Sequence, residues 1–90
     1  MPFIKIPAPL RPYVNGQAQV PVQGGTASEA LEYMLAQFPA FRPHLCKDDG
    51  SLRAFVNLYL DKTNIRDLQG LDTPLAPEET LNLVPAIAGG

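Results

Sequence analysis

The two C-terminal glycines, Gly89 and Gly90, are the residues of this chain best suited to chemistry. They follow an apolar segment in the terminal sequence LVPAIAGG. A terminal glycine carries an α-carboxylate whose ordinary pKa is about 3.3–3.7, so the group is ionised at neutral pH. Because glycine has no side chain, such a tail could pass through a narrow tunnel into a partner's active site. There the carboxylate could attack the α-phosphate of ATP, and the resulting acyl-adenylate could accept a sulfur or nitrogen nucleophile.

An internal Gly24-Gly25 pair provides a comparison for the terminal one. It lies in VQGGTAS, between a predicted strand and a predicted helix. Backbone freedom at such a junction is a sufficient reason for glycine. We therefore assign this pair no chemical role, and we assign the terminal pair its role because of its position at the carboxylate.

The segment RPHLCKDD holds other residue types that can be reactive. His44 and Cys46 could form a nucleophile and its base, but residues two apart on a short turn face away from each other. One histidine and one cysteine are too few for a zinc site. Asp48 and Asp49 fit a solvated turn better than a cation site. The sequence therefore predicts neither a catalytic residue nor a metal site.

Three arginines, Arg11, Arg53 and Arg66, could pair with acidic surfaces of a partner. Ordinary surface charge is the competing interpretation, and the sequence does not decide between the two.

The N-terminal third of the chain predicts two strands. Residues 3–6, FIKI, are rich in strand-forming types. Three prolines in residues 7–13 exclude a central strand there and indicate an extended edge segment or an irregular crossing. Asn15-Gly16 fits a two-residue hairpin turn. Residues 17–22 are then the returning strand, with Ala18, Val20 and Val22 on one face.

A helix is predicted from Ala27 to Phe38. Thr26 and Glu29 have the spacing of a capping box, and Pro39 ends the helical pattern. The apolar residues that share one face of this helix are Leu31, Met34, Leu35 and Phe38. Residues 40–51 are expected to form a loop with at most one helical turn.

The C-terminal half predicts three further strands. Residues 52–60 alternate, with Phe55, Asn57 and Tyr59 on one face and Val56, Leu58 and Leu60 on the other. Asp61-Lys62 turns the chain into a short strand at residues 63–65, a turn of helix is expected near residues 77–79, and residues 81–87 form the last strand. The sequence does not show which face of the strongest strand covers the helix.

This order of elements predicts an α+β domain of the β-grasp type, the layout of ubiquitin. A right-handed crossover makes the first and last strands parallel neighbours in a mixed sheet of about five strands, packed on one main helix. Residues 1–90 would form one domain, with residues 86–90 as a flexible tail. At 90 residues the chain can build one two-layer core.

Composition excludes several function classes. The net charge is −2 and no basic stripe is visible, which argues against nucleic-acid binding. No apolar run approaches the roughly 18 residues of a membrane span. A single cysteine cannot form an internal disulfide, so we expect a cytoplasmic protein.

The C-terminal half resembles the ubiquitin-like sulfur carriers of the ThiS/MoaD family. The motifs that carry the resemblance are Val56-Asn57, Tyr59, Ile65-Arg66, Leu71 to Leu75 and Pro85 to Gly90. The N-terminal residues Leu10-Arg11-Pro12 and Gly16 are similar to the CysO-type branch, which serves cysteine biosynthesis. The resemblance covers nearly the whole chain.

The resemblance implies a carrier protein that is not itself an enzyme. Gly90 would be adenylated and converted to a thiocarboxylate by a ThiF/MoeB-like enzyme, and Gly89 would pass the partner's tunnel. The docking stem would consist of Pro85, Ala86, Ile87 and Ala88. A cysteine synthase dependent on pyridoxal phosphate and a zinc-dependent peptidase of the JAMM type would be further partners, and ATP, pyridoxal phosphate and zinc would belong to these partners. We expect a monomer that forms transient complexes.

Three alternatives remain open from the sequence. The chain could be the small subunit of molybdopterin synthase, a ubiquitin-like modifier joined to lysines, or a plain binding module with an inert tail.

Overall fold

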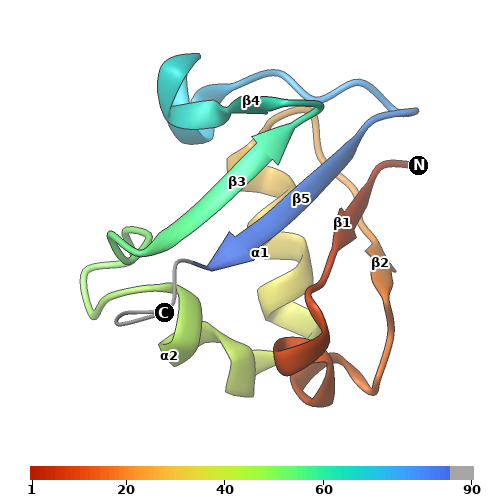
Figure 1. Cartoon of the computed structure of the whole chain (residues 1–90), viewed down its shortest axis with the longest axis vertical. Coiled ribbons are helices and arrows are strands. Elements are labelled where there is room, and N and C mark those ends of the chain that lie inside the picture. Colours follow the sequence, from red (N-terminus) through yellow and green to blue (C-terminus); the bar gives the residue numbers. More distant parts are fainter. Residues whose placement is uncertain (86–90) are drawn as a thin grey trace.

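The computed structural model describes residues 1–85, which form two layers, a mixed sheet and the helix α1 packed across one of its faces (Figure 1). Within these residues five strands have the order β2-β1-β5-β3-β4. The strands are β1 (Phe3–Lys5), β2 (Gln19–Pro21), β3 (Val56–Leu60), β4 (Thr63–Asn64) and β5 (Thr80–Pro85). The α-helices are α1 (Ala27–Gln37) and α2 (Arg42–Leu45), and the 3-10 helices are η1 (Ala8–Val14), η2 (Pro39–Phe41), η3 (Ile65–Asp67) and η4 (Gly70–Asp72). The predicted β-grasp arrangement is confirmed.

Strand β5 lies at the centre of the sheet. It runs parallel to β1, with Ile4 opposite Leu81, and antiparallel to β3, with Leu58 opposite Leu83. The predicted parallel pairing of the first and last strands is therefore confirmed. Since both edges of β5 are hydrogen-bonded, the element that leads to the C-terminus is fixed from both sides.

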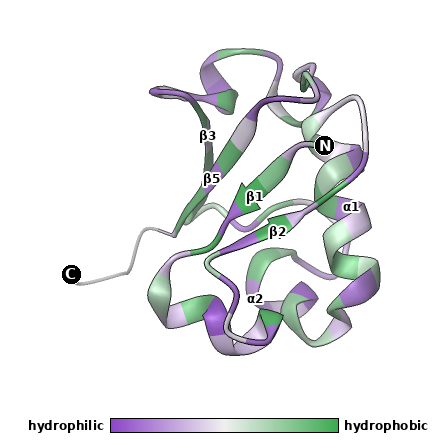
Figure 2. Ribbon diagram, turned by 90° about the vertical axis from the view of Figure 1, so that its right-hand side faces the viewer, coloured by the Kyte–Doolittle hydropathy of each residue, from purple (hydrophilic) through white to green (hydrophobic). Residues whose placement is uncertain are grey.

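The core lies between the sheet and α1. Strand residues alternate across the sheet, so Ile4, Leu58 and Leu81 point toward α1 and are at most 1% exposed. Figure 2 shows apolar residues along the helix where it faces the sheet. Burial of one such side chain contributes about 1.5–3 kcal/mol relative to leaving it in water. The helix residues predicted to share a face are Leu31, Met34 and Leu35, which are buried, and Phe38, which packs partly buried against the core.

The N-terminus of α1 has the predicted cap with one difference. Thr26 Oγ1 accepts a hydrogen bond from the Glu29 backbone N–H at 3.2 Å. The Glu29 carboxylate accepts from the Gly25 N–H at 2.7 Å, whereas a standard capping box would use the N–H of Thr26. The cap therefore includes Gly25, and it joins the glycine pair to the first turn of α1.

The proline-rich segment after β1, predicted to be an extended edge segment or an irregular crossing, is not an extended edge. It forms η1, because proline's fixed φ suits the first turn of a helix as well as an extended chain. Asn15 has a φ of 58° and Gly16 a φ of 78°, but they end η1 and do not form a two-residue hairpin turn. The Gly16 N–H donates to the Arg11 carbonyl at 2.8 Å. The strand after it begins at Gln19, and Ala18 is exposed while Val20 is buried.

Two further predictions about element boundaries are wrong. Strand β3 begins only at Val56, because residues 52–55 form a bridge and a turn. The helical turn expected near residues 77–79 is a simple turn in which the Glu79 N–H donates to the Ala76 carbonyl at 3.0 Å. The loop at residues 40–51 contains the expected helical turn, α2, and also the end of η2, which directly precedes it.

Candidate functional site

The end of β5 is the last described part of the predicted docking stem. Pro85 is half-buried and lies opposite Val56 at the start of β3. Figure 1 shows this end of β5 beside the start of β3 and close to α2. The other predicted tail residues, Ala86, Ile87, Ala88, Gly89 and Gly90, lie outside the described residues.

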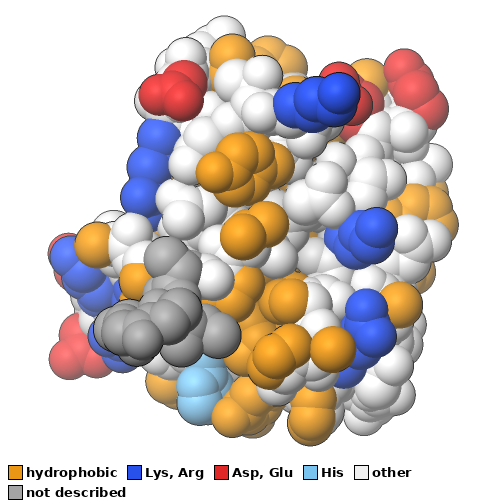
Figure 3. Space-filling view, viewed as in Figure 1, with side chains coloured by type: hydrophobic (Ala, Val, Ile, Leu, Met, Phe, Trp, Pro, Cys, Tyr) orange, Lys and Arg blue, Asp and Glu red, His pale blue; other side chains and the backbone are white. Residues whose placement is uncertain are grey.

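The sheet face opposite α1 is open to solvent and carries apolar side chains. Val56 and Leu58 are buried toward the helix, so Asn57 and Tyr59 lie on the outer side of β3, and Phe55 is an exposed residue of the turn that precedes the strand. Phe55 is 41% exposed, and Val84 on β5 is 44% exposed. Figure 3 shows hydrophobic side chains in a band down the middle of this face, with Lys and Arg side chains on both sides. The sequence left open which side of this strand covers the helix. The structure shows that the side with Val56 and Leu58 covers it, so the side with Asn57 and Tyr59 faces outward. This outer face combines apolar and charged side chains, as binding surfaces do.

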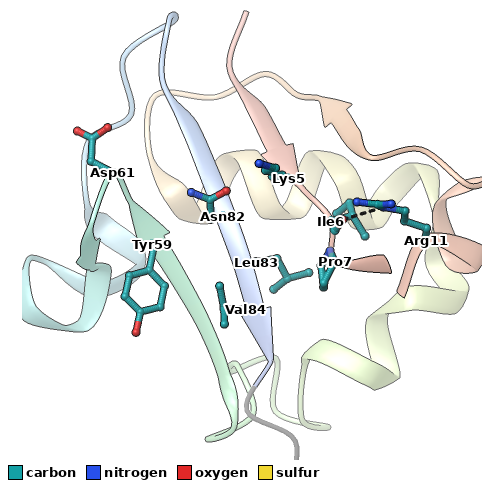
Figure 4. A pocket seen from close by; sticks show the side chains of 9 residues that line it. All are labelled: Lys5, Ile6, Pro7, Arg11, Tyr59, Asp61, Asn82, Leu83 and Val84. Carbon is teal, nitrogen blue, oxygen red and sulfur yellow. Dashed lines mark hydrogen bonds between the residues drawn. The ribbon is translucent and has the colours of Figure 1, made fainter. Parts of the chain in front are cut away.

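A shallow groove of about 470 Å³ crosses this face between β1, β5 and β3. Tyr59 and Val84 point outward on one side of it, and Pro7 and Arg11 lie on the other (Figure 4). Lys5 lines the same groove. The groove thus combines apolar side chains with two cations and the carboxylate of Asp61, and it runs along β5.

Arg11 borders the groove and is held in place by its own chain. Its Nε donates a hydrogen bond to the Ile6 carbonyl at 3.1 Å, as drawn in Figure 4. This bond links η1 to the end of β1. The guanidinium is therefore fixed beside the groove, which keeps open the predicted role of pairing with an acidic partner.

Arg53 and Arg66 have structural partners that the sequence did not indicate. Arg53 Nε donates to the Pro43 carbonyl at 2.9 Å, and Arg66 donates to several carbonyls at the start of β3. Hydrophobic periodicity contains no information about such bonds. The signal that could have identified Arg66 is its position two residues after Asn64, whose side chain caps η3 by accepting from the Arg66 N–H.

The histidine and cysteine of the α2 segment do not form a catalytic pair. Cys46 is 4% exposed, and burial raises the pKa of its thiol, which disfavours the reactive thiolate. His44 is exposed and its ring packs on Tyr13, with ring centroids 4.3 Å apart. Asp49 accepts hydrogen bonds from Ser51, as expected of a turn. Among residues 1–85 no group of His, Cys, Asp and Glu side chains could hold a metal ion.

The described part of the chain contains no helix with the length and hydrophobicity that crossing a bilayer requires.

A mixed β-grasp sheet whose central strand leads to the C-terminus defines a ubiquitin-like protein. The model of the ThiS family matches residues 4–90. The sulfur carrier protein CysO of Mycobacterium tuberculosis is 32% identical over 89 residues, which cover 97% of this chain and 96% of CysO. The chain therefore belongs to the ThiS family, and within it to the sulfur carrier proteins of the CysO type.

Solved structures agree with this placement. A chain of the Amycolatopsis orientalis BexX/CysO complex superposes with a TM-score of 0.89 at 28% identity and complete coverage of both chains. The small archaeal modifier protein 1 of Methanosarcina acetivorans has a TM-score of 0.86 at 24% identity, covering 99% of this chain and 95% of the other. The second likeness concerns the fold alone.

Proposed function

We propose that this protein carries sulfur as a thiocarboxylate on Gly90. The terminal carboxylate attacks the α-phosphorus of ATP, pyrophosphate leaves, and an acyl-adenylate forms. Sulfide (HS⁻) from a sulfur donor then attacks the acyl carbon, AMP leaves with the electrons of the acyl–oxygen bond, and loss of the sulfur-bound proton gives the thiocarboxylate. The observation that supports this proposal best is the match to the ThiS family through residue 90, together with 32% identity to CysO along nearly the full chain.

The role of the folded domain in this proposal is to present the tail. Strand β5 is anchored between β1 and β3, so the stem that begins at Pro85 leaves from a rigid base. Gly89 would pass the partner's tunnel, and the stem residues before it, including Ile87, would give the partner apolar contacts. The outer sheet face, with Tyr59 and Val84 along its groove, would bind the same partner.

Other proteins would supply the cofactors in this scheme. The activating partner would be an ATP-dependent adenylating enzyme of the ThiF/MoeB type. The sulfur acceptor would be an activated serine on a cysteine synthase that holds pyridoxal phosphate, and a zinc peptidase of the JAMM type would release cysteine. The similarity to CysO supports this cysteine pathway over thiamin or molybdopterin synthesis.

Intact-mass spectrometry tests the proposal. The chain is incubated with an adenylating enzyme of this type, ATP and a sulfide donor, and its mass should rise by the difference between one sulfur and one oxygen atom. A variant lacking Gly89 and Gly90 is the matched control and should keep its mass and its unfolding midpoint. Unchanged mass of the wild-type chain with adenylating enzymes from the same genome would refute the proposal.

Two further experiments separate this proposal from the alternative functions. A stable two-subunit complex on co-purification would indicate a subunit of molybdopterin synthase, and isopeptide-linked products on denaturing gels would indicate a modifier.

A further inference from the structure

The side chain of Arg66 forms an unusually dense set of hydrogen bonds for an exposed residue. Its Nη1 donates to the Ala54 carbonyl at 3.0 Å and to Asn57 Oδ1 at 3.2 Å. Its Nη2 donates to the Val56 carbonyl at 2.9 Å and to the Arg53 carbonyl at 3.2 Å. One guanidinium thus binds three backbone carbonyls of a single turn, a geometry that its planar fork of donors favours.

A second layer of contacts fixes Arg66 itself. The Arg66 backbone N–H donates to Asn64 Oδ1 at 2.9 Å, and Asn64 Nδ2 donates to Asn57 Oδ1 at 3.0 Å. Asn57 lies on the outer face of β3, and Asn64 is at the end of β4. The three side chains therefore join β4 and η3 to the start of β3.

The turn that Arg66 holds lies at the point where the tail begins. This turn, residues 53–56, leads into β3, and Val56 lies directly opposite Pro85 at the end of β5. The turn is also tied to α2, because the Arg53 N–H donates to the Leu45 carbonyl at 2.9 Å. Phe55 is the large apolar side chain of the turn and is 41% exposed, next to the last pair of the β3–β5 ladder.

These contacts argue against the simple use of Arg66 as a docking charge. Both terminal nitrogens of its guanidinium already donate to carbonyl oxygens of the turn, so a partner's carboxylate would have to displace them. The turn, in contrast, needs the guanidinium, because a lysine presents a compact ammonium and cannot span the same carbonyls.

We propose that Arg66 is a positioning residue, which holds the Phe55 turn as a rigid apolar contact for the adenylating partner beside the base of the tail. This inference rests on the proposed function. Arg66 acts through the turn: it orders Phe55 before the partner binds, and less conformational freedom is then lost on association. The partner surface that fits Phe55 is an apolar recess at the rim of its tail tunnel.

Steady-state kinetics of adenylation, measured by release of pyrophosphate, test the proposal by comparing four variants with the wild-type chain. The variants are Arg66→Lys, Phe55→Ala and the double variant, with Arg42→Lys as the matched control. Arg42 makes an exposed ion pair with Glu32 at 2.8 Å, and its side chain donates no hydrogen bond to residues 53–56. We expect Arg66→Lys and Phe55→Ala each to raise the KM for the carrier about five- to tenfold with kcat unchanged, as for lost uniform binding, and the double variant to add no further increase.

A structural measurement accompanies the kinetics. Amide chemical shifts of residues 53–57 should move in Arg66→Lys and stay in place in Arg42→Lys, while the thermal midpoints of both remain close to wild type. The proposal is overturned by an unchanged KM in either single variant, or by multiplied effects in the double variant, which would show that Arg66 does not act through Phe55. If the wild-type chain is not adenylated at all, both the proposed function and this inference are refuted. If the wild-type chain is adenylated and the KM of the Arg66→Lys variant is unchanged, only the inference about Arg66 is refuted.

Discussion

Replacing Gly24 by alanine should unfold this protein far more readily than the same change at Gly25. Gly24 has a φ of 144°, a backbone conformation that side chains rarely adopt. A Cβ at this position would lie 2.6 Å from Glu29 Cβ and 2.8 Å from the Ala30 backbone nitrogen. The Ala30 N–H donates to the Thr26 carbonyl at 3.0 Å in the first turn of α1, so it cannot move without disturbing the helix.

The expected loss in the free energy of unfolding follows from two contributions. Strain of a non-glycine residue at positive φ costs about 1–2 kcal/mol, and insertion of a methyl group into a filled space costs about 1–3 kcal/mol. Together they give about 2–5 kcal/mol, a large part of the roughly 5–15 kcal/mol that stabilises a typical domain. A Cβ at Gly25, in contrast, would meet only the flexible end of Glu29, at 3.5 Å. Gly25→Ala should therefore change stability by less than about 1 kcal/mol.

Urea denaturation followed by far-ultraviolet circular dichroism measures both variants. We expect a reduced midpoint with an unchanged slope for Gly24→Ala, and a thermal midpoint lower by at least about 8 °C, since each kcal/mol shifts a domain of this size by about 4–8 °C. Equal midpoints for Gly24→Ala and Gly25→Ala would refute the reasoning, because they would show that the chain reaches this junction in another conformation.

Three further predictions concern the core, the thiol and the ion pair. Leu81→Ala should cost about 2–5 kcal/mol in denaturant unfolding, because the side chain of Leu81, on the central strand β5, is fully buried, and a loss below about 1 kcal/mol would contradict the packing described. Cys46 should react with a disulfide reagent on the order of tenfold more slowly in the folded chain than in urea, because burial raises the pKa of its thiol. A Cys46→Ala variant should still accept sulfur in the intact-mass assay. If it did not, the thiol of Cys46, and not the C-terminal carboxylate, would be the group that accepts sulfur. Hydrogen bonds from Arg42 hold the pKa of the Glu32 carboxyl group below its ordinary value. The ion pair therefore stabilises the folded state at any pH above the ordinary pKa, and this stabilisation is lost as the pH falls through the lowered pKa. The small difference in thermal midpoint between wild type and Glu32→Gln should therefore vanish in acid. A difference that grows as the pH falls would contradict the expected link between ionised Glu32 and stability of the folded state.

The main elements could be predicted from the sequence because they depend on periodic burial. The helix from Ala27 onward and the β3 and β5 strands repeat apolar residues at helical or alternating spacing. The helix begins where expected, and β3 lies within its expected range but begins only at Val56. The parallel pairing of β1 with β5 followed from the handedness of crossovers. Alternation divided the residues of β3 into two sets, but the sequence did not show which set faces outward. Burial of Val56 and Leu58 shows that the other set does.

The features that the sequence did not predict are aperiodic ones. Proline restricts φ to a value shared by 3-10 helices and extended chains, so residues 8–14 could adopt either. Asn15-Gly16 tolerates positive φ in a hairpin and equally at the end of η1. The bonds of Arg66 join residues 9–13 positions apart through a side chain, and no local pattern encodes them.

The central position of β5 also has a mechanical consequence. Tension applied between the start of β1 and the end of β5 would pull two parallel neighbours in opposite directions, and their hydrogen bonds would then be loaded together in shear. The antiparallel ladder to β3 resists the same displacement along β5. An enzyme that draws the C-terminal residues into its active site would therefore pull on the most strongly braced strand of the carrier, and the domain would follow as a rigid body without unravelling.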